Sequence, residues 1–107
     1  MVWIRTSDGQ GLVYPERGLK IVARWKSVSP KEKKAVIAVS MLSCMGEAGF
    51  GLGRQEFKLN GQRDEELKNE ADEICKKIIA ILWDFLKQGK DFDMNDVFKM
   101  VLKEGRA

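Results

Sequence analysis

The sequence predicts an α+β fold: a small N-terminal antiparallel sheet of three or four strands packed on a three-helix layer. Three observations lead to this prediction. Residues 1–26 contain short apolar runs separated by turn residues, which is typical of strands. Residues 63–88 repeat apolar side chains at intervals of four and three, which is typical of a helix. The 107 residues match the size of one domain, so we expect residues 1–107 to form a single α+β domain.

The first part of the chain predicts three strands. Residues 2–5 and 12–14 are short apolar runs, and the segment SDGQG between them has the residues of a turn. Pro15 cannot donate a backbone hydrogen bond and ends the second run. Residues 19–26 alternate, with Lys20, Arg24 and Lys26 on one face and Trp25 on the other. We expect these strands to form an antiparallel meander, with a fourth strand in RQEFKLNG, residues 54–61.

The next segment predicts the central helix. Ser29 stands at the N-cap position, Pro30 at the first helical position, and Glu32 where it can bond back to the cap. No charged residue occurs between Ala35 and Met45, and a helix that is apolar all round is buried on several sides. Glycines at 46 and 49 are expected to end this helix.

Two further helices are expected in the C-terminal half. The longest spans Arg63–Gln88 and ends at Gly89. Its apolar residues form two neighbouring seams, of which one has heptad-like spacing. The first seam contains Leu67, Ala71, Ile74, Ile78, Ile81 and Phe85, and the second contains Cys75, Ile79, Leu82 and Leu86, with Trp83 widening the face. Asp93 is expected to cap a last helix with an apolar stripe from Met94 to Leu102.

The composition excludes much of the usual enzyme chemistry. The chain has no histidine and two cysteines, so it cannot assemble a Ser-His or Cys-His nucleophile pair or a mixed Cys/His zinc site. We therefore expect no enzyme activity, no catalytic residues, no metal and no cofactor. The two cysteines are expected to be reduced thiols in a cytoplasmic protein. The longest uncharged run, residues 35–46, is shorter than the roughly 20 apolar residues of a membrane span, so no membrane association is expected.

Three segments resemble known binding motifs but lack residues or surroundings that those motifs require. The glycines of CMGEAGFGLGRQEF lack the lysine of a P-loop and follow an expected helix instead of a strand, although Arg54 and free backbone amides leave a capacity for anions. The segment DFDMND begins like a calcium loop, but Asp96 replaces the glycine and Leu102 the terminal glutamate. The acidic residues 64–73 have no matching acidic helix for a two-metal site and suit the positive end of a helix instead.

The surplus of apolar helix surface favours a protein that acts through protein contacts. If the remaining elements cannot cover both seams of residues 63–88, a second chain is expected to cover them. The leading hypothesis is a small, non-enzymatic interaction or regulatory protein that self-associates and also binds another protein. Regulators, assembly subunits and inhibitors carried by mobile elements or viruses all fit this description. The expected interface residues are Ile79, Leu82, Trp83 and Leu86.

The alternative hypothesis is nucleic-acid binding by the basic N-terminal third. Residues 1–34 contain eight Lys or Arg and three Asp or Glu, a net charge of +5, against +3 for the whole chain. Aromatic residues such as Trp3, Tyr14 and Trp25 are candidate stacking surfaces for unpaired bases. The same charges are also compatible with an ordinary solvated sheet face. The residues expected to contact nucleic acid are Lys20, Arg24, Lys26, Lys31, Lys33, Lys34 and Arg54.

Overall fold

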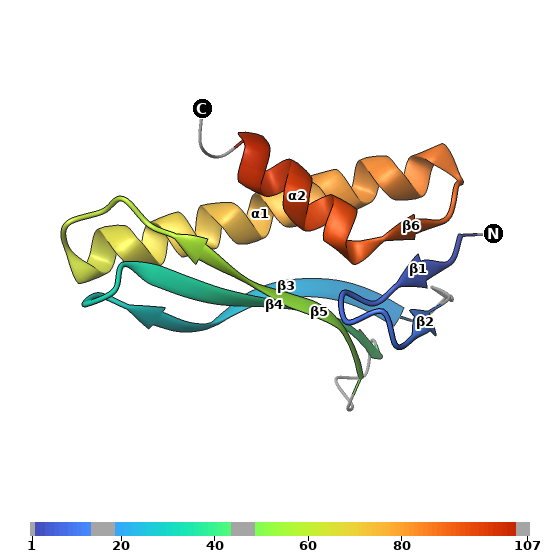
Figure 1. Cartoon of the computed structure of the whole chain (residues 1–107), viewed down its shortest axis with the longest axis horizontal. Helices are drawn as coiled ribbons and strands as arrows, with labels where there is room; N and C mark the ends of the chain where they lie inside the picture. Colours follow the sequence, from blue (N-terminus) through green and yellow to red (C-terminus); the bar gives the residue numbers. More distant parts are fainter. Residues whose placement is uncertain (1, 14–18, 44–48, 105–107) are drawn as a thin grey trace.

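The computed structural model describes residues 2–13, 19–43 and 49–104. Within these residues the chain forms two three-stranded sheets and two helices (Figure 1). The strands are β1 (Ile4–Arg5), β2 (Leu12–Val13), β3 (Leu19–Ser29), β4 (Lys34–Ser43), β5 (Phe50–Lys58) and β6 (Phe92–Asp93). The helices are α1 (Asp64–Gln88) and α2 (Met94–Glu104). The α+β class is as predicted, but the three-helix layer is wrong.

The expected central helix is the middle strand of the larger sheet. The β4 strand, Lys34–Ser43, pairs antiparallel with β3 on one side and β5 on the other. Its β-branched residues Val36, Ile37 and Val39 favour extended backbone, and a short apolar run fits a buried strand as well as a buried helix. Every second residue from Ala35 to Met41, among them Ile37 and Val39, is fully buried. The uncharged run therefore reflects a central strand, and the helical interpretation was wrong.

The expected N-cap at Ser29 forms a turn between two strands. The Ser29 hydroxyl oxygen accepts a hydrogen bond from the Glu32 amide, 3.3 Å away, as it would in a capping box. However, residues 30–33 lead into β4, and Lys33 takes a left-handed conformation with φ of 53°. This local hydrogen bond is compatible with a turn and with a helix start. In both cases a serine oxygen can accept from the amide three residues later. Cys44 and Gly46, and with them most of the expected helix end, lie outside the described residues.

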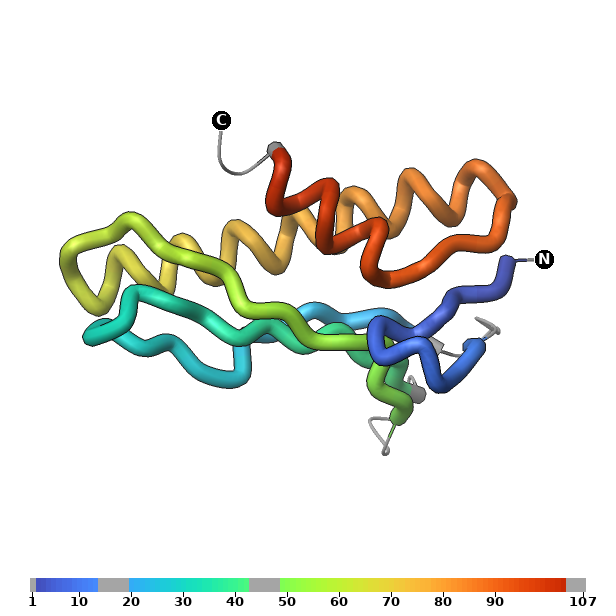
Figure 2. The backbone as a smooth tube through the Cα atoms, in the orientation of Figure 1, coloured from blue at the N-terminus to red at the C-terminus, as the bar shows by residue number. Residues whose placement is uncertain are grey.

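The predicted meander of the first three strands was also wrong. β1 pairs antiparallel with β2 and parallel with β6, so the first strands belong to a separate small sheet of order β2-β1-β6. The amide of Phe92 donates to the carbonyl of Trp3 at 3.1 Å, and the amide of Trp3 donates to Asp91 Oδ1 at 2.9 Å. Figure 2 shows the N-terminal segment running beside the connection between the two helices. The fourth strand is confirmed as β5, which starts four residues earlier than RQEFKLNG.

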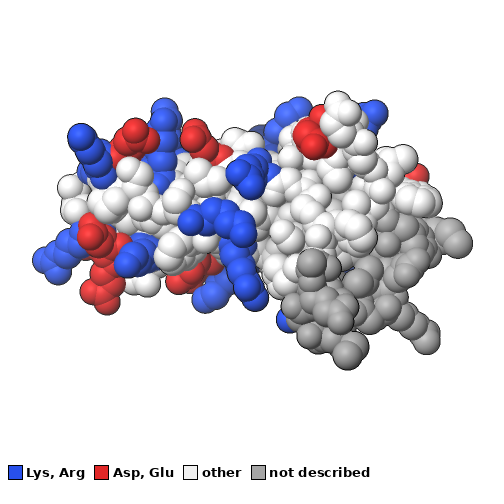
Figure 3. Space-filling model, turned by 90° about the horizontal axis from the view of Figure 1, so that it is seen from below, with Lys and Arg blue, Asp and Glu red and all other residues white. Residues whose placement is uncertain are grey.

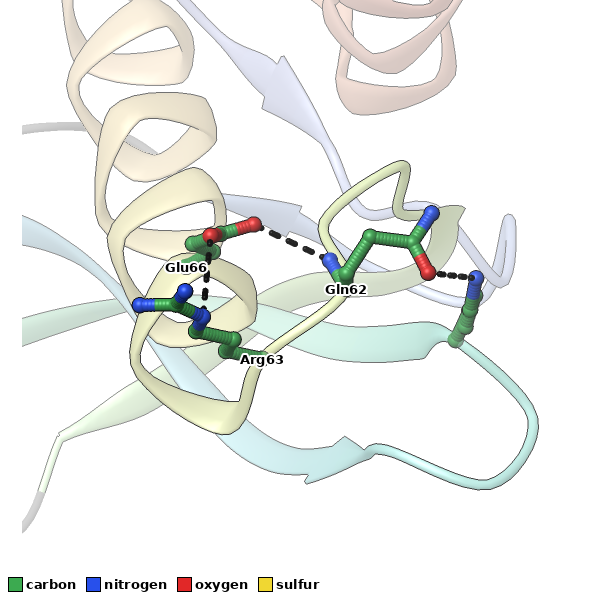
Figure 4. Close-up of polar contacts among 4 residues, drawn as sticks. Gln62, Arg63 and Glu66 are labelled. Carbon is green, nitrogen blue, oxygen red and sulfur yellow. Dashed lines mark hydrogen bonds and ion pairs between the residues drawn. The ribbon is translucent and has the colours of Figure 1, made fainter.

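The two C-terminal helices are confirmed. α1 ends at Gly89, whose φ of 71° is left-handed and whose amide donates to the Leu86 carbonyl at 3.2 Å. At its start, Glu66 accepts a hydrogen bond from the Gln62 amide at 3.0 Å and lies 3.9 Å from the Arg63 side chain (Figure 4). Asp93 accepts a hydrogen bond from the Asn95 amide at 2.8 Å, which caps α2 as expected.

Both helices lie on one face of the β3-β4-β5 sheet, as Figure 1 shows. The core lies between the helices and the inner face of the sheet. It joins residues of β4 and β5 with Ile78 and Leu82 of α1 and with Phe98 of α2. No described helix or strand covers the opposite face of the sheet in Figure 1.

Candidate nucleic-acid interface

The uncovered face of the β3-β4-β5 sheet, which we call the outer face, is lined by basic residues on all three strands. Side chains that are cross-strand partners share a face. Arg24 pairs with Ala38, and Ala38 pairs with Arg54, so these three residues form one row across the outer face. Both arginines are exposed, and Ala38 between them is short. Two guanidinium groups therefore flank a shallow strip of β4.

A bulge in β3 adds a third cation beside this row. The register shifts between Trp25 and Ser27, which leaves Lys26 as the extra residue. Trp25 points inward, because its partner Ile37 is buried, whereas Lys26 is exposed. Lys26 also lines a recess together with Ala38 and Arg54, so it lies on the outer face next to Arg24.

The other end of the outer face carries a pair of like charges. Lys34 of β4 lies directly opposite Lys58 of β5, and Lys20 occupies the far end of β3 opposite Leu42. Like charges in directly opposed positions repel and lower stability. Glu56, opposite Val36, is the one acidic residue among the described positions of this face. Figure 3, viewed from the side of the sheet, shows Lys and Arg side chains across the middle of the face.

The cations at the centre of the outer face are free of ion pairs among the described residues. The two ion pairs within that part of the chain join Arg63 to Glu66 and Lys76 to Glu73, both at the helix layer. Hence the charges of Arg24, Lys26 and Arg54 are not neutralised by neighbouring carboxylates and can act on an anionic ligand.

The structure thus brings five of the seven predicted basic residues to one face and leaves two aside. Lys20, Arg24, Lys26, Lys34 and Arg54 share the outer face. Lys31 is exposed in the turn between β3 and β4. Lys33 is in the same turn, but its ammonium group donates to the Gln62 side-chain oxygen at 3.4 Å, beside the start of α1. Sequence reasoning missed Lys58, although its alternation with Phe57 and Leu59 already indicated the outward face.

Of the four predicted interface residues on α1, two lie in or against the core and two are exposed. Leu82 is only 2% exposed and belongs to the core, and Leu86 packs against the core. By contrast, Trp83 is 59% exposed and Ile79 is 38% exposed. These two residues are four apart and therefore neighbours on the helix surface. The Lys87 ammonium lies 5.3 Å from the centre of the Trp83 ring.

The described residues contain no group of three or more His, Cys, Asp or Glu side chains placed to hold a metal ion. In the same part of the chain, no helix has both the length and the apolar character needed to cross a membrane. Comparisons with known protein families, with curated proteins and with solved structures found no match to this chain.

Proposed function

We propose that this protein binds duplex nucleic acid through the outer face of the β3-β4-β5 sheet. The observation that carries the proposal is the row formed by Arg24, Ala38 and Arg54, in which two cations without ion pairs flank the short side chain of Ala38 on a face that no described helix or strand covers. The neighbouring cations Lys20, Lys26, Lys34 and Lys58 extend this charge along the sheet. The phosphate backbone supplies most of the affinity in such complexes.

The dimensions of the sheet favour a duplex. Strands lie about 4.8 Å apart, so the backbones of Arg24 and Arg54, two strands apart, are separated by roughly 10 Å. The major groove of B-DNA is about 12 Å wide and accepts a two-stranded β-ribbon, with phosphates on both sides of it. The outer face can therefore lie against the groove, with its cations near the phosphates on either side.

The orientation of the aromatic residues argues against single strands. Proteins that bind single strands stack the bases on aromatic side chains. The Trp25 indole nitrogen instead donates to Asp72 Oδ1 on α1 at 2.9 Å, and Phe57 is buried under the helices. Among the described residues, no aromatic side chain belongs to the outer face by register. Stacking on this face is therefore not expected.

The test is the salt dependence of binding to a labelled duplex of random sequence, measured by fluorescence anisotropy. Each phosphate contact contributes a slope of about −0.9 to log K against log salt concentration. Arg24→Ala and Lys58→Ala are each expected to reduce the slope by about one unit. Lys68→Ala and Lys99→Ala remove the same charge from exposed positions of α1 and α2 and should leave binding unchanged. Equal effects of all four substitutions would refute a site on the outer face.

A second candidate function, self-association through α1, is supported by the exposed Ile79 and Trp83. A pair of large apolar side chains on one helix surface is suited to a contact with a second copy of the chain or with another protein. The rest of the apolar seam is used in the core, so the patch is smaller than the sequence suggested. Self-association and nucleic-acid binding use opposite layers of the molecule and are compatible.

A further inference from the structure

A recess beside the outer face combines groups of opposite charge. Its volume is about 440 Å³, and it lies between the β4–β5 part of the sheet and the turn that follows β1. Ala38 and Ser40 are among its lining residues, Lys26 and Arg54 contribute the cations, and Asp8 of the turn contributes a carboxylate. The recess therefore presents hydrogen-bond donors and an acceptor to the same ligand.

The Asp8 carboxylate is held in place by its own turn. Its Oδ1 atom accepts a hydrogen bond from the Thr6 hydroxyl at 2.7 Å and another from the Gln10 amide at 2.9 Å. These bonds, that of Thr6 foremost, lower the pKa of Asp8, so the group is ionised at neutral pH. Two longer-range bonds fix the turn itself: the Ser7 amide donates to the Leu52 carbonyl, and Asn95 Nδ2 donates to the Ser7 carbonyl, both at 2.9 Å.

This mixture of groups does not suit a phosphate. A phosphate oxygen accepts hydrogen bonds and carries negative charge, so the ionised Asp8 would repel it. A ligand that matches the recess must present acceptors to Arg54 and a donor to Asp8. The edge of a base pair in the major groove offers both kinds of group.

Of the base pairs, G·C matches these groups best. Guanine presents the acceptors N7 and O6, which Arg or Lys binds in the commonest specific contact, and cytosine presents the N4 amino donor, which Asp or Glu accepts. At an A·T pair the arginine would face the adenine amino donor, and the thymine methyl would approach the carboxylate. RNA duplexes are disfavoured, because the A-form major groove is too deep and narrow for side chains to read.

We propose that the recess reads a G·C pair in the major groove of duplex DNA, with Arg54 donating to guanine and Asp8 accepting from the cytosine amino group. This inference rests on the proposed function. It assigns sequence preference to Asp8 and Arg54, whereas Arg24 and the lysines of the outer face supply the general affinity.

The test is selection from a randomised duplex DNA library, followed by titration of the selected duplex and of variants with one pair changed. The wild-type protein is expected to select at least one invariant G·C position. Asp8→Asn should reduce the preference for G·C over A·T at that position by roughly ten-fold while the salt slope stays the same. Arg54→Lys should also weaken the preference, because lysine cannot form the two parallel bonds of arginine.

Glu56→Gln is the matched control, since it removes a carboxylate from the outer face outside the recess. It should raise the affinity for all duplexes equally and leave the base preference unchanged. If Asp8→Asn behaves in the same way, the recess does not read a base pair and the proposal is overturned. Selection without any preferred G·C position would also overturn it while leaving the proposed function intact. No binding of wild-type protein to any duplex would overturn both.

Discussion

The indole nitrogen of Trp25 in β3 donates a hydrogen bond to Asp72 Oδ1 in α1, at 2.9 Å and across 47 residues of sequence. This bond ties an edge strand of the larger sheet to the helix layer. It also directs the indole away from the outer face, which leaves that face to cations and small apolar residues.

Removal of this bond should loosen the contact between β3 and α1. Asp72→Ala is expected to lower the free energy of unfolding by about 1 kcal/mol, since a hydrogen bond of this kind contributes roughly 0.5–1.5 kcal/mol. Urea denaturation followed by tryptophan fluorescence measures the change. Asp84→Ala removes an exposed carboxylate further along α1 and serves as the control. A loss equal to that of the control would show that the bond contributes nothing.

A carboxylate placed between Arg24 and Arg54 should abolish nucleic-acid binding. In Ala38→Glu the new side chain extends from the middle of the row, where it pairs with both guanidinium groups and repels phosphates. Ala38→Gln has nearly the same shape without the charge and is expected to retain most of the affinity. Anisotropy titrations of both variants, with circular dichroism to verify the fold, give the comparison. Equal loss in the two variants would indicate a steric effect instead of an electrostatic one.

The turn after β1 should depend on the glycine at position 53. A Cβ atom added there would meet the Ser7 side chain and approach Phe98 to 3.2 Å. Gly53→Ala is therefore expected to lower the free energy of unfolding by about 1–3 kcal/mol, as overpacking does in well-packed regions. The double variant with Ser7→Gly should recover part of this loss, because the conflicting atoms are gone. Thermal denaturation of the single and double variants tests this coupling, and purely additive losses would disprove it.

Cys75 should react slowly with thiol reagents in the folded protein. Burial raises the pKa of the Cys75 thiol above its usual 9.0, and the charge of Asp72 raises it further. A raised pKa favours the protonated thiol in the fold, so this contribution to stability is complete below pH 9 and decreases as the pH rises. A Cys44→Ser variant isolates the signal of Cys75. Its labelling rate at pH 8 should increase many-fold in denaturant, and an equal rate in both conditions would contradict the expected burial.

Adjacent residues of α1 should respond differently to the same substitution. Trp83→Lys is expected to preserve the fold, because the side chain is exposed, and to weaken any self-association. Leu82→Lys buries a charge in the core and is expected to unfold the protein. Gel filtration with light scattering measures the mass, and circular dichroism measures the helix content. A wild-type protein that stays at 12.2 kDa at high micromolar concentration would exclude self-association.

The sequence by itself determined the helices and strands that are specified by residues close together in the chain. α1 was predictable because an apolar period sustained over 25 residues indicates a helix. Gly89 marks the end of α1 through its left-handed backbone, and Asp93 marks the start of α2 through its side-chain cap. The exposed cations of β3 were likewise predictable, because strict alternation places them opposite Trp25. These features depend on neighbours within a few positions of the chain.

Only the tertiary structure decided whether residues 34–43 form a helix or a strand. An apolar run of this length satisfies a buried helix and a central strand equally well, and the bond from Glu32 to Ser29 forms in either case. Pairing with both β3 and β5 selects the strand, because it satisfies the backbone hydrogen-bonding groups of all three segments at once. The same pairing aligns Arg24 with Arg54, thirty positions apart in sequence, which no local pattern specifies. The candidate interface therefore depends on the register of the three strands, and long-range contacts fix that register.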